Sequence, residues 1–553
     1  GRPVPASEAG IFAAYLDLVY GRDNLQMITD SMTFGASFPN GRSGDLSVPG
    51  LVSEAGAFQG FPLNPDSGLL TVFTVDFRGL NPGITTVQAD PADVSSDSPV
   101  PGTSPIHDTL TINPAAAVAH DDINFKTLTV AVTAGSGEGG SGTQSPTLGD
   151  GSISIHGTGG SSTGRNNLGV LIHTAATVST GSGELEVTGI GGGSGTSEAN
   201  NGIQIGDAVV STTSGPLRLS GTGGLTTGKW NHGVGIWNGA TVTSATGDIS
   251  VNGTGGGIDA SPGNHGVQIA NNTVVGTTST GNVSIIGQGG SNDGFRNIGV
   301  VVQGTDGRVE TSLGNINIQG TGGSGTGSNN LGIAVFNSGV ISSGKGDLTL
   351  TGRAGESGGM YNHGITTDGA NTRILTVDGN LTAVGYGGGS GVDSDGNHGF
   401  EMTNESQIAS TGLGNISFES HGGTSLGNYN VGLVIRTDAS VTSNEGRIDI
   451  TSFAGTGTSG HGIAIAESTG GLIASTGGDI NILTDAFAIT PAGSITSGNN
   501  SSISIAPRTK HSRVLLGDDT SLQGAWLQLS DSELDQFNTP SLTIGNSTSG
   551  EII

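Results

Sequence analysis

Oxygen donors alternate in the stretch DSDGN, where Asp393, Asp395 and Asn397 occupy every second position. Carboxylate and amide oxygens at this spacing are the ligands that a Ca²⁺ loop uses. The distal bidentate glutamate of such a loop is missing at its proper spacing. The three residues therefore form an incomplete calcium site, for which a solvated turn is the simpler interpretation. Calcium is the one cofactor that the sequence suggests.

Five histidines each stand immediately before the glycine of a repeated phrase: His232, His265, His363, His398 and His461. If successive repeats stack as strands do, two pairs of these histidines lie about 5 Å apart, which would permit a metal ion between them. Other repeats place Leu, Ile, Val or Asn at the same position, so it also accepts a partly buried side chain that binds nothing. We interpret the histidines as structural and keep metal binding as the alternative.

The phrase reads NNLGVLI at 166–172 and returns as NNGIQI, WNHGVGI and GNHGVQI. It recurs about every 33 residues, and such internal repetition is typical of solenoids. Each unit holds three short segments in which apolar and polar residues alternate, as half-buried strands require. We therefore predict an all-β fold, a parallel three-faced β-helix of about 33 residues per coil. Analogy with known three-faced β-helices makes it right-handed.

An asparagine stands two residues before the repeat glycine in nine units. Asn tolerates the left-handed backbone of tight turns and hydrogen bonds to nearby main chain, so we place these residues at a turn. Stacked coils would bring their side chains together as a ladder of amides with a structural role. The ladder residues are Asn167, Asn200, Asn231, Asn264, Asn297, Asn330, Asn362, Asn397 and Asn430.

Catalysis on a β-helix would need acid and base carboxylates close together on outward positions of adjacent coils. The outward column of the third strand holds Glu186 and Asp449, which are many coils apart, and that of the first strand holds Glu401. Since no two carboxylates occupy neighbouring coils in either column, we predict that the protein is not an enzyme. The first-strand column is Leu171, Gln204, Gly235, Gln268, Val301, Ala334, Thr366, Glu401, Val434 and Ala464.

Aromatic residues gather near the glycine-rich loops and near the turn that follows the first strand. They are Trp230, Trp237, Phe295, Phe336 and Tyr361. Such rings could stack on sugars or on a neighbouring molecule, although singly exposed aromatic side chains commonly do neither.

The composition narrows the classes of partner. The 553 residues include 18 Lys and Arg against 46 Asp and Glu, with a formal net charge of −28 and no cysteine. This balance argues against nucleic acid and anionic membranes as partners. No apolar run approaches the roughly 20 residues of a membrane-spanning helix. Without disulfides, stability must come from the stacking of coils.

The two ends differ from the repeats. Residues 1-105 alternate strand-like segments with turns, which predicts a β-sandwich. The segments EAGIFAAYLDLVY, GLVSEAGAFQGFPL and LLTVFTVDFRGLNPGITTVQADPADV resemble the later strands of cohesin-like domains in very large secreted bacterial repeat proteins. This resemblance implies a partial cohesin-like domain whose opening strands precede Gly1.

Beyond this domain we expect transition and capping coils over 106-150, regular repeats over 151-485 and irregular C-terminal coils over 486-553. Ser530 and Glu533 have the spacing of a capping box for a short helical turn. The C-terminal stretches, among them LQLSDSELDQF and SLTIGNSTSGEII, resemble the repeat regions of filamentous-haemagglutinin and autotransporter-adhesin proteins.

The repeats and these resemblances imply a bacterial protein outside the cell or on its surface, with a structural or adhesive role. We expect self-association into a fibre or layer, because solenoid ends and an incomplete sandwich expose β edges that accept a strand from a neighbour. The alternatives are a polysaccharide lyase or hydrolase and a glycan-binding adhesin. The partners we expect are further copies of the chain and surface glycans, with no nucleic acid and no membrane span.

Overall fold

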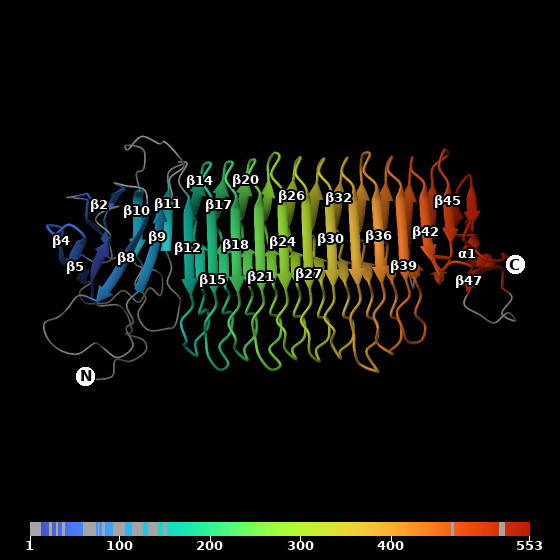
Figure 1. Cartoon of the computed structure of the whole chain (residues 1–553), viewed down its shortest axis with the longest axis horizontal. Coiled ribbons are helices and arrows are strands. Elements are labelled where there is room, and N and C mark those ends of the chain that lie inside the picture. The colour runs from blue at the N-terminus through green and yellow to red at the C-terminus, as the bar shows by residue number, and fades with distance from the viewer. Residues whose placement is uncertain are drawn as a thin grey trace.

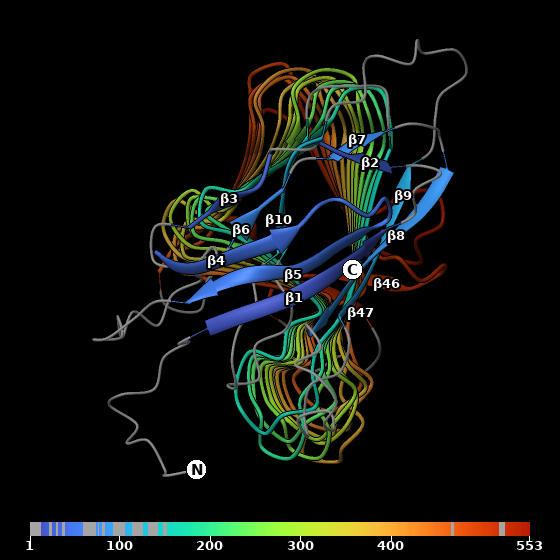
Figure 2. The same ribbon diagram turned by 90° about the vertical axis from the view of Figure 1, so that its left-hand side faces the viewer.

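A computed structural model describes residues 13–20, 25–28, 31–35, 39–58, 73–75, 77–79, 83–91, 106–112, 125–130, 142–146, 152–465, 469–518 and 526–553. Over these residues the chain is all-β apart from one short helix, α1 (Asp531–Leu534). Its main body is a parallel β-solenoid whose coils follow one another along the long axis of the molecule (Figure 1). Seen along that axis, the coils superimpose closely (Figure 2). The predicted fold class is confirmed.

Three parallel sheets form the solenoid, with 13, 11 and 12 strands. We call them sheets A, B and C. Sheet A contains β12 (Ile153–Thr158), β15 (Leu185–Ile190), β18 (Leu217–Thr222), β21 (Ile249–Thr254), β24 (Val283–Gln288), β27 (Ile316–Thr321), β30 (Leu348–Arg353), β33 (Leu381–Tyr386), β36 (Ile416–His421), β39 (Ile448–Phe453), β42 (Ile480–Thr484), β45 (Ile503–Ala506) and β49 (Leu542–Ile544).

Sheets B and C hold the shorter strands of each coil. Sheet B contains β13 (Val170–His173), β16 (Ile203–Gly206), β19 (Val234–Trp237), β22 (Val267–Ala270), β25 (Val300–Gln303), β28 (Ile333–Phe336), β31 (Ile365–Asp368), β34 (Phe400–Thr403), β37 (Leu433–Ile435), β40 (Ile463–Ile465) and β43 (Phe487–Ile489). Sheet C contains β14 (Thr177–Thr180), β17 (Val209–Thr212), β20 (Thr241–Ser244), β23 (Val274–Thr277), β26 (Arg308–Thr311), β29 (Val340–Ser343), β32 (Arg373–Thr376), β35 (Gln407–Ser410), β38 (Ala439–Ser443), β41 (Gly471–Ser475), β44 (Ser494–Ser497) and β48 (Phe537–Asn538).

Equivalent residues of successive coils pair in register. Ile153 pairs with Leu185 and Leu185 with Leu217, so each turn takes about 32 residues. Along β18, buried and exposed residues alternate without exception. The inward side chains of the three sheets meet in one apolar core, in which Val178 and Val210 are fully buried. Since burying one such side chain contributes about 1.5–3 kcal/mol, stacking stabilises a chain that has no disulfide.

A glycine-rich lobe connects each sheet A strand to the next sheet B strand, and small hydroxyl residues fill its interior. The Thr226 hydroxyl donates to the Ser197 carbonyl of the preceding coil at 2.7 Å, and the Ser425 hydroxyl donates to the Ser394 carbonyl at 2.5 Å. These side chains are buried. The solenoid therefore has an apolar core between its sheets and a hydrogen-bonded polar core in the lobe.

The described N-terminal strands form small antiparallel sheets. The largest has the order β4 (Asn40–Asp45), β5 (Leu51–Phe58), β1 (Ala13–Tyr20), β8 (Gly83–Pro91), β9 (Ile106–Ile112). Three antiparallel pairs join β2 (Leu25–Met27) to β7 (Phe77–Gly79), β3 (Thr33–Phe34) to β6 (Phe73–Thr74), and β10 (Phe125–Val130) to β11 (Gly142–Pro146).

The expected boundary after residue 105 falls inside this region, because β9 belongs to the large antiparallel sheet. β9 also lies beside β12, and β11 lies beside β14. The segment after 105 therefore contacts the first strands of sheets A and C with antiparallel strands. Much of 1–151, including parts of the segments that resemble cohesin-like domains, lies outside the described residues.

At the other end, the sheets continue with irregular spacing. Ile480 pairs with Ile503 and Ile503 with Leu542, while β46 (Arg513–Leu516) and β47 (Trp526–Leu529) form a separate parallel pair. The predicted capping box is confirmed at α1, where Ser530 accepts from the Glu533 main-chain N–H and Glu533 accepts from the Ser530 N–H. Among the described residues, no helix has the length and apolar character needed to cross a membrane.

Candidate functional site

The asparagine column forms a continuous buried ladder. The Asn264 Oδ1 accepts from the main-chain N–H of Asn231 at 2.9 Å and from the Asn231 Nδ2 at 3.1 Å. In the next coil, the Asn297 Oδ1 accepts from the main-chain N–H of Asn264 at 2.8 Å. All nine ladder side chains are fully buried, with exposures of 0%. The ladder thus satisfies a column of main-chain N–H groups that solvent does not reach.

The backbone of the turn differs from the expectation. The left-handed residue is the one before each ladder asparagine, with φ of 61° at Asn166, 63° at Trp230 and 57° at Arg296. The prediction that the ladder asparagine itself takes this conformation is wrong. Its amide points into the coil to meet the next amide, so the preceding residue makes the turn and carries an outward side chain.

A second ladder, which the sequence analysis missed, runs along the surface just before sheet A. Asp248 accepts from the Asn282 N–H at 2.8 Å, and Asn282 accepts from the Asn315 N–H at 2.9 Å. The signal was present in the sequence, because Asp or Asn directly precedes the third strand in many units. Asp347, Asn380 and Asn415 continue this outer ladder.

The histidine column is a third ladder. His232 Nδ1 accepts from the His265 N–H at 3.1 Å, and His363 Nδ1 accepts from the His398 N–H at 3.1 Å. In both pairs the rings stack with centroids 4.8 Å apart. A histidine whose Nδ1 accepts carries its proton on Nε2 when neutral, and stacked parallel rings do not direct two lone pairs at one ion. This geometry favours the structural interpretation of the histidines.

Burial favours the neutral form of three of the stacked rings, those of His232, His265 and His398. Burial lowers the pKa of His265 to about 4, with a smaller effect from Arg296, and lowers the pKa of His398 to about 3. Burial also holds the pKa of His232 well below its usual value. Within the part of the chain that the structure describes, no three His, Cys, Asp or Glu residues cluster to hold a metal.

The calcium candidates lie around one turn of the lobe. Asn397 belongs to the buried ladder, and its Oδ1 accepts from the Asn362 N–H at 3.0 Å and from the Asn362 Nδ2 at 3.2 Å. The Asp395 carboxylate accepts from the Asn428 N–H at 2.6 Å, while Asp393 is exposed. The Asn397 oxygen is thus directed into the ladder, and calcium binding by the two aspartates stays a prediction.

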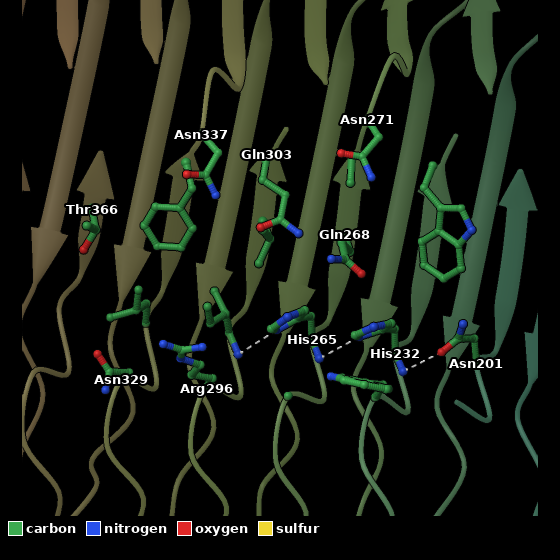
Figure 3. Close-up of a pocket in the computed structure, with 18 of the residues that line it drawn as sticks. Asn201, His232, His265, Gln268, Asn271, Arg296, Gln303, Asn329, Asn337 and Thr366 are labelled. Atoms are coloured by element: carbon green, nitrogen blue, oxygen red, sulfur yellow. Dashed lines mark hydrogen bonds between the residues drawn. The ribbon is translucent and has the colours of Figure 1, made fainter. Parts of the chain in front are cut away.

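A groove of about 860 Å³ crosses the coils on the outer face of sheet B. Its floor follows the first-strand column, with Gln204, Gln268 and Glu401 among the residues that line it. Figure 3 shows His232, His265 and Arg296 along one side and Asn271 and Asn337 along the other. Because the sheet B strands pair in register, each coil adds one residue to each column of the lining, and the groove therefore follows the solenoid axis.

The groove is rich in side-chain amides and nearly balanced in charge. Its charged side chains are Arg296, Asp368 and Glu401. Trp230, Trp237 and Phe336 add aromatic rings. Nine carboxamides line it: Asn166, Asn201, Gln204, Asn238, Gln268, Asn271, Gln303, Asn329 and Asn337. Each carboxamide offers both donors and acceptors, so this lining suits a ligand with many hydroxyl groups.

Glu401, at one end of the groove, is 6% exposed. Its Oε2 lies 3.2 Å from His363 Nε2 and its Oε1 lies 2.5 Å from the Arg436 guanidinium. Burial alone would raise the pKa of Glu401, but His363, His398 and Arg436 together hold it well below its usual range. The carboxylate therefore stays ionised in an ion pair and is poorly suited to donate a proton.

No family model, no curated protein and no solved structure matches the chain.

Several groove residues were predicted separately from the sequence. Trp230, Trp237 and Phe336 come together at one site, whereas Phe295 and Tyr361 lie outside the lining. The rim amides that follow the sheet B strands were not predicted. Their signal was an asparagine after the first strand, in the stretches WNG, ANN and FNS.

Proposed function

We propose that the protein is an extracellular adhesive protein whose rigid solenoid binds an extended polysaccharide along the groove without cleaving it. The observation that carries this proposal is the groove itself, in which nine carboxamides and three aromatic rings lie along one face of stacked coils. Hydroxyl groups match carboxamides as hydrogen-bond partners, and aromatic rings pack against the apolar faces of sugars.

The length of the groove supports a polymeric ligand. Its floor residues run from Gln204 in β16 to Glu401 in β34. With strands about 4.8 Å apart, this distance is about 30 Å. A groove of this length along a straight axis suits a chain of several sugar units better than a single small molecule.

The carboxylates support binding over cleavage. Among the described residues that line the groove, Asp368 and Glu401 are the carboxylates. Glycoside cleavage uses one carboxyl group whose raised pKa keeps it protonated. Glu401 has the opposite shift, and Asp368 accepts a hydrogen bond from Asn404 Nδ2 at 2.7 Å.

The sequence resemblances support the location. Repeats like those of filamentous-haemagglutinin and autotransporter-adhesin proteins favour a bacterial surface or extracellular protein. Self-association into a fibre or layer stays part of the proposal, because a groove repeated along an assembly would bind one polysaccharide at many points and gain avidity.

Affinity electrophoresis in native gels that contain a polysaccharide tests the proposal. We expect slower migration in at least one polysaccharide and no new reducing ends after incubation. Gln268→Ala should weaken the retardation, while Gln319→Ala, which truncates an exposed glutamine on sheet A, should not. Release of reducing or unsaturated ends would favour the enzyme, and unchanged migration in a broad set of neutral and acidic polysaccharides would contradict the proposal.

A further inference from the structure

One coil of the groove differs from its neighbours, because it has a glycine in the floor column where they have glutamines. In the floor column, Gly235 stands between Gln204 and Gln268. A Cβ at residue 235 would lie 2.6 Å from Cη2 and 3.0 Å from Cε3 of the Trp237 indole. The indole therefore lies against the bare backbone of Gly235, in the place where the adjacent coils carry glutamine side chains.

This arrangement lays the Trp237 ring down on the groove floor. The His232 ring meets it edge-on, with centroids 6.2 Å apart and planes at 77°. The Gly235 backbone covers one side of the Trp237 ring, and the side chain remains partly exposed. A flat aromatic ring that lies on a backbone and is open to the groove is a stacking surface for the apolar face of a pyranose ring.

Trp230 adds a second ring from the same coil. It is 43% exposed, and a Cβ at Gly263 of the next coil would lie 3.0 Å from its Cδ1. The Lys229 ammonium lies 4.1 Å from the Trp230 ring centroid. Trp230 thus forms a raised edge of the groove at the coil where Trp237 forms its floor.

Beyond this coil, the side-chain amides of Gln268 and Gln303 project into the groove (Figure 3). Within the described part of the chain no hydrogen bond holds either amide, so both are available to a ligand. By contrast, the Gln204 oxygen already accepts from Asn201 at 3.2 Å. Among the glutamines of the groove, the free amides therefore begin one coil after the tryptophans, at Gln268, and continue along the axis with Gln303.

The net charge of the protein and the charges in the groove favour an uncharged polysaccharide over an acidic one. The protein carries a formal charge of −28, and an acidic polymer approaching it meets repulsion. The groove lining contains one cationic side chain, Arg296, and two carboxylates, Asp368 and Glu401, of which Glu401 is paired with Arg436. An uncharged chain needs no counter-charge, whereas a chain with one acid per sugar would find one guanidinium along the lining, that of Arg296, and the Lys229 ammonium beside Trp230.

We infer that the ligand is an uncharged pyranose polysaccharide, anchored by stacking on Trp237 beside Trp230 and held further along the axis by Gln268 and Gln303. This inference rests on the proposed function and specifies its ligand class. The chain lies along the solenoid axis, because the tryptophans and the free amides belong to successive coils.

The test compares native gels that contain hydroxyethyl cellulose, galactomannan or xylan with gels that contain polygalacturonate or alginate. We expect retardation by at least one neutral polymer, little change with added NaCl, and no retardation by the acidic polymers. Trp237→Ala should weaken the binding about tenfold, the loss expected for one stacking contact. Trp237→Phe should retain more of the binding because it keeps a ring.

The matched control is Tyr429→Ala, since Tyr429 holds the same turn position as Trp230 in a coil outside the groove and is 55% exposed. It should bind as the unmodified protein does, and far-UV circular dichroism and Tm establish that each variant folds. If Trp237→Ala fails to fold, Trp237→Phe and Gln303→Ala test the same site. Binding confined to acidic polymers, or neutral binding that folded Trp237→Ala leaves intact, overturns the inference but keeps the proposed function. Binding to no polymer overturns both.

Discussion

The buried asparagine ladder should be a main source of stability, and truncation of one member tests this directly. In Asn264→Ala the main-chain N–H of Asn231 loses its acceptor at 2.9 Å and stays buried. The Asn264 Nδ2 also donates to the Ser261 carbonyl at 2.8 Å and to Asn297 Oδ1 at 3.1 Å, and these bonds vanish as well. One orphaned buried N–H costs about 1–3 kcal/mol and each lost bond about 1 kcal/mol. We expect the free energy of unfolding to fall by about 4 kcal/mol.

The outer ladder supplies the matched control. Asn282 makes the same kind of contacts, accepting from the Asn315 N–H at 2.9 Å and donating to Asp248 at 3.0 Å, but it is exposed. Water replaces these bonds, so Asn282→Ala should cost no more than about 1 kcal/mol. Guanidinium unfolding followed by far-UV circular dichroism measures both variants. If the two lower the midpoint equally, at the same m value, burial of the ladder is not what makes it stabilising.

Three further predictions concern pH, the ion pair and assembly. In the folded protein the pKa of His265 is about 4 and that of His398 about 3, against about 6.5 in the unfolded chain. As the pH drops from 7 to 5, these histidines therefore take up protons in the unfolded chain but not in the folded protein, and Tm should fall. His265→Asn, which copies Asn201 in the same column, should flatten this dependence, and an unchanged slope would contradict the assignment. Arg436→Ala removes the guanidinium from the buried Glu401, which keeps its contact with His363, and should lower the free energy of unfolding by about 2 kcal/mol. Glu401→Val, which copies Val434 of the next coil, should lower it less. If Glu401→Val lowers Tm more than Arg436→Ala does, the ion pair is contradicted. Negative-stain electron microscopy should show fibres or sheets longer than one solenoid. If a chelator removes these fibres or sheets, calcium takes part in the assembly. Isolated rods would contradict self-association.

The three strand columns were predictable because two periods coincide in the sequence. Apolar residues such as Ile153 and Ile155 alternate within a strand, and Leu185 and Val187 repeat the pair one coil later. A parallel solenoid must place such residues in register, since a shift by one residue would expose every inward side chain. The same argument predicted that the asparagines would lie in one column.

The turn and the groove were harder to predict for physical reasons. Trp230, Arg296 and Tyr361 all adopt a left-handed backbone, although none of these residue types favours it. The ladder holds the following asparagine so firmly that it dictates the backbone of the residue before it. The groove depends on contacts between columns, such as Trp237 over Gly235, and a contact made in a single coil leaves no periodic signal.

These two observations connect the stability of the protein to its proposed role. The ladders fix the coil spacing through residues that repeat, Asn231 and Asn264 among them. The groove is built from residues that break the repeat, such as Gly235, Trp237 and Glu401. Because the frame is already rigid, binding an extended chain along it orders little of the protein, and the free energy of the contacts is available for affinity. Recognition in this solenoid should therefore change with substitutions at the exceptional residues, whereas substitutions in the ladders should change stability first.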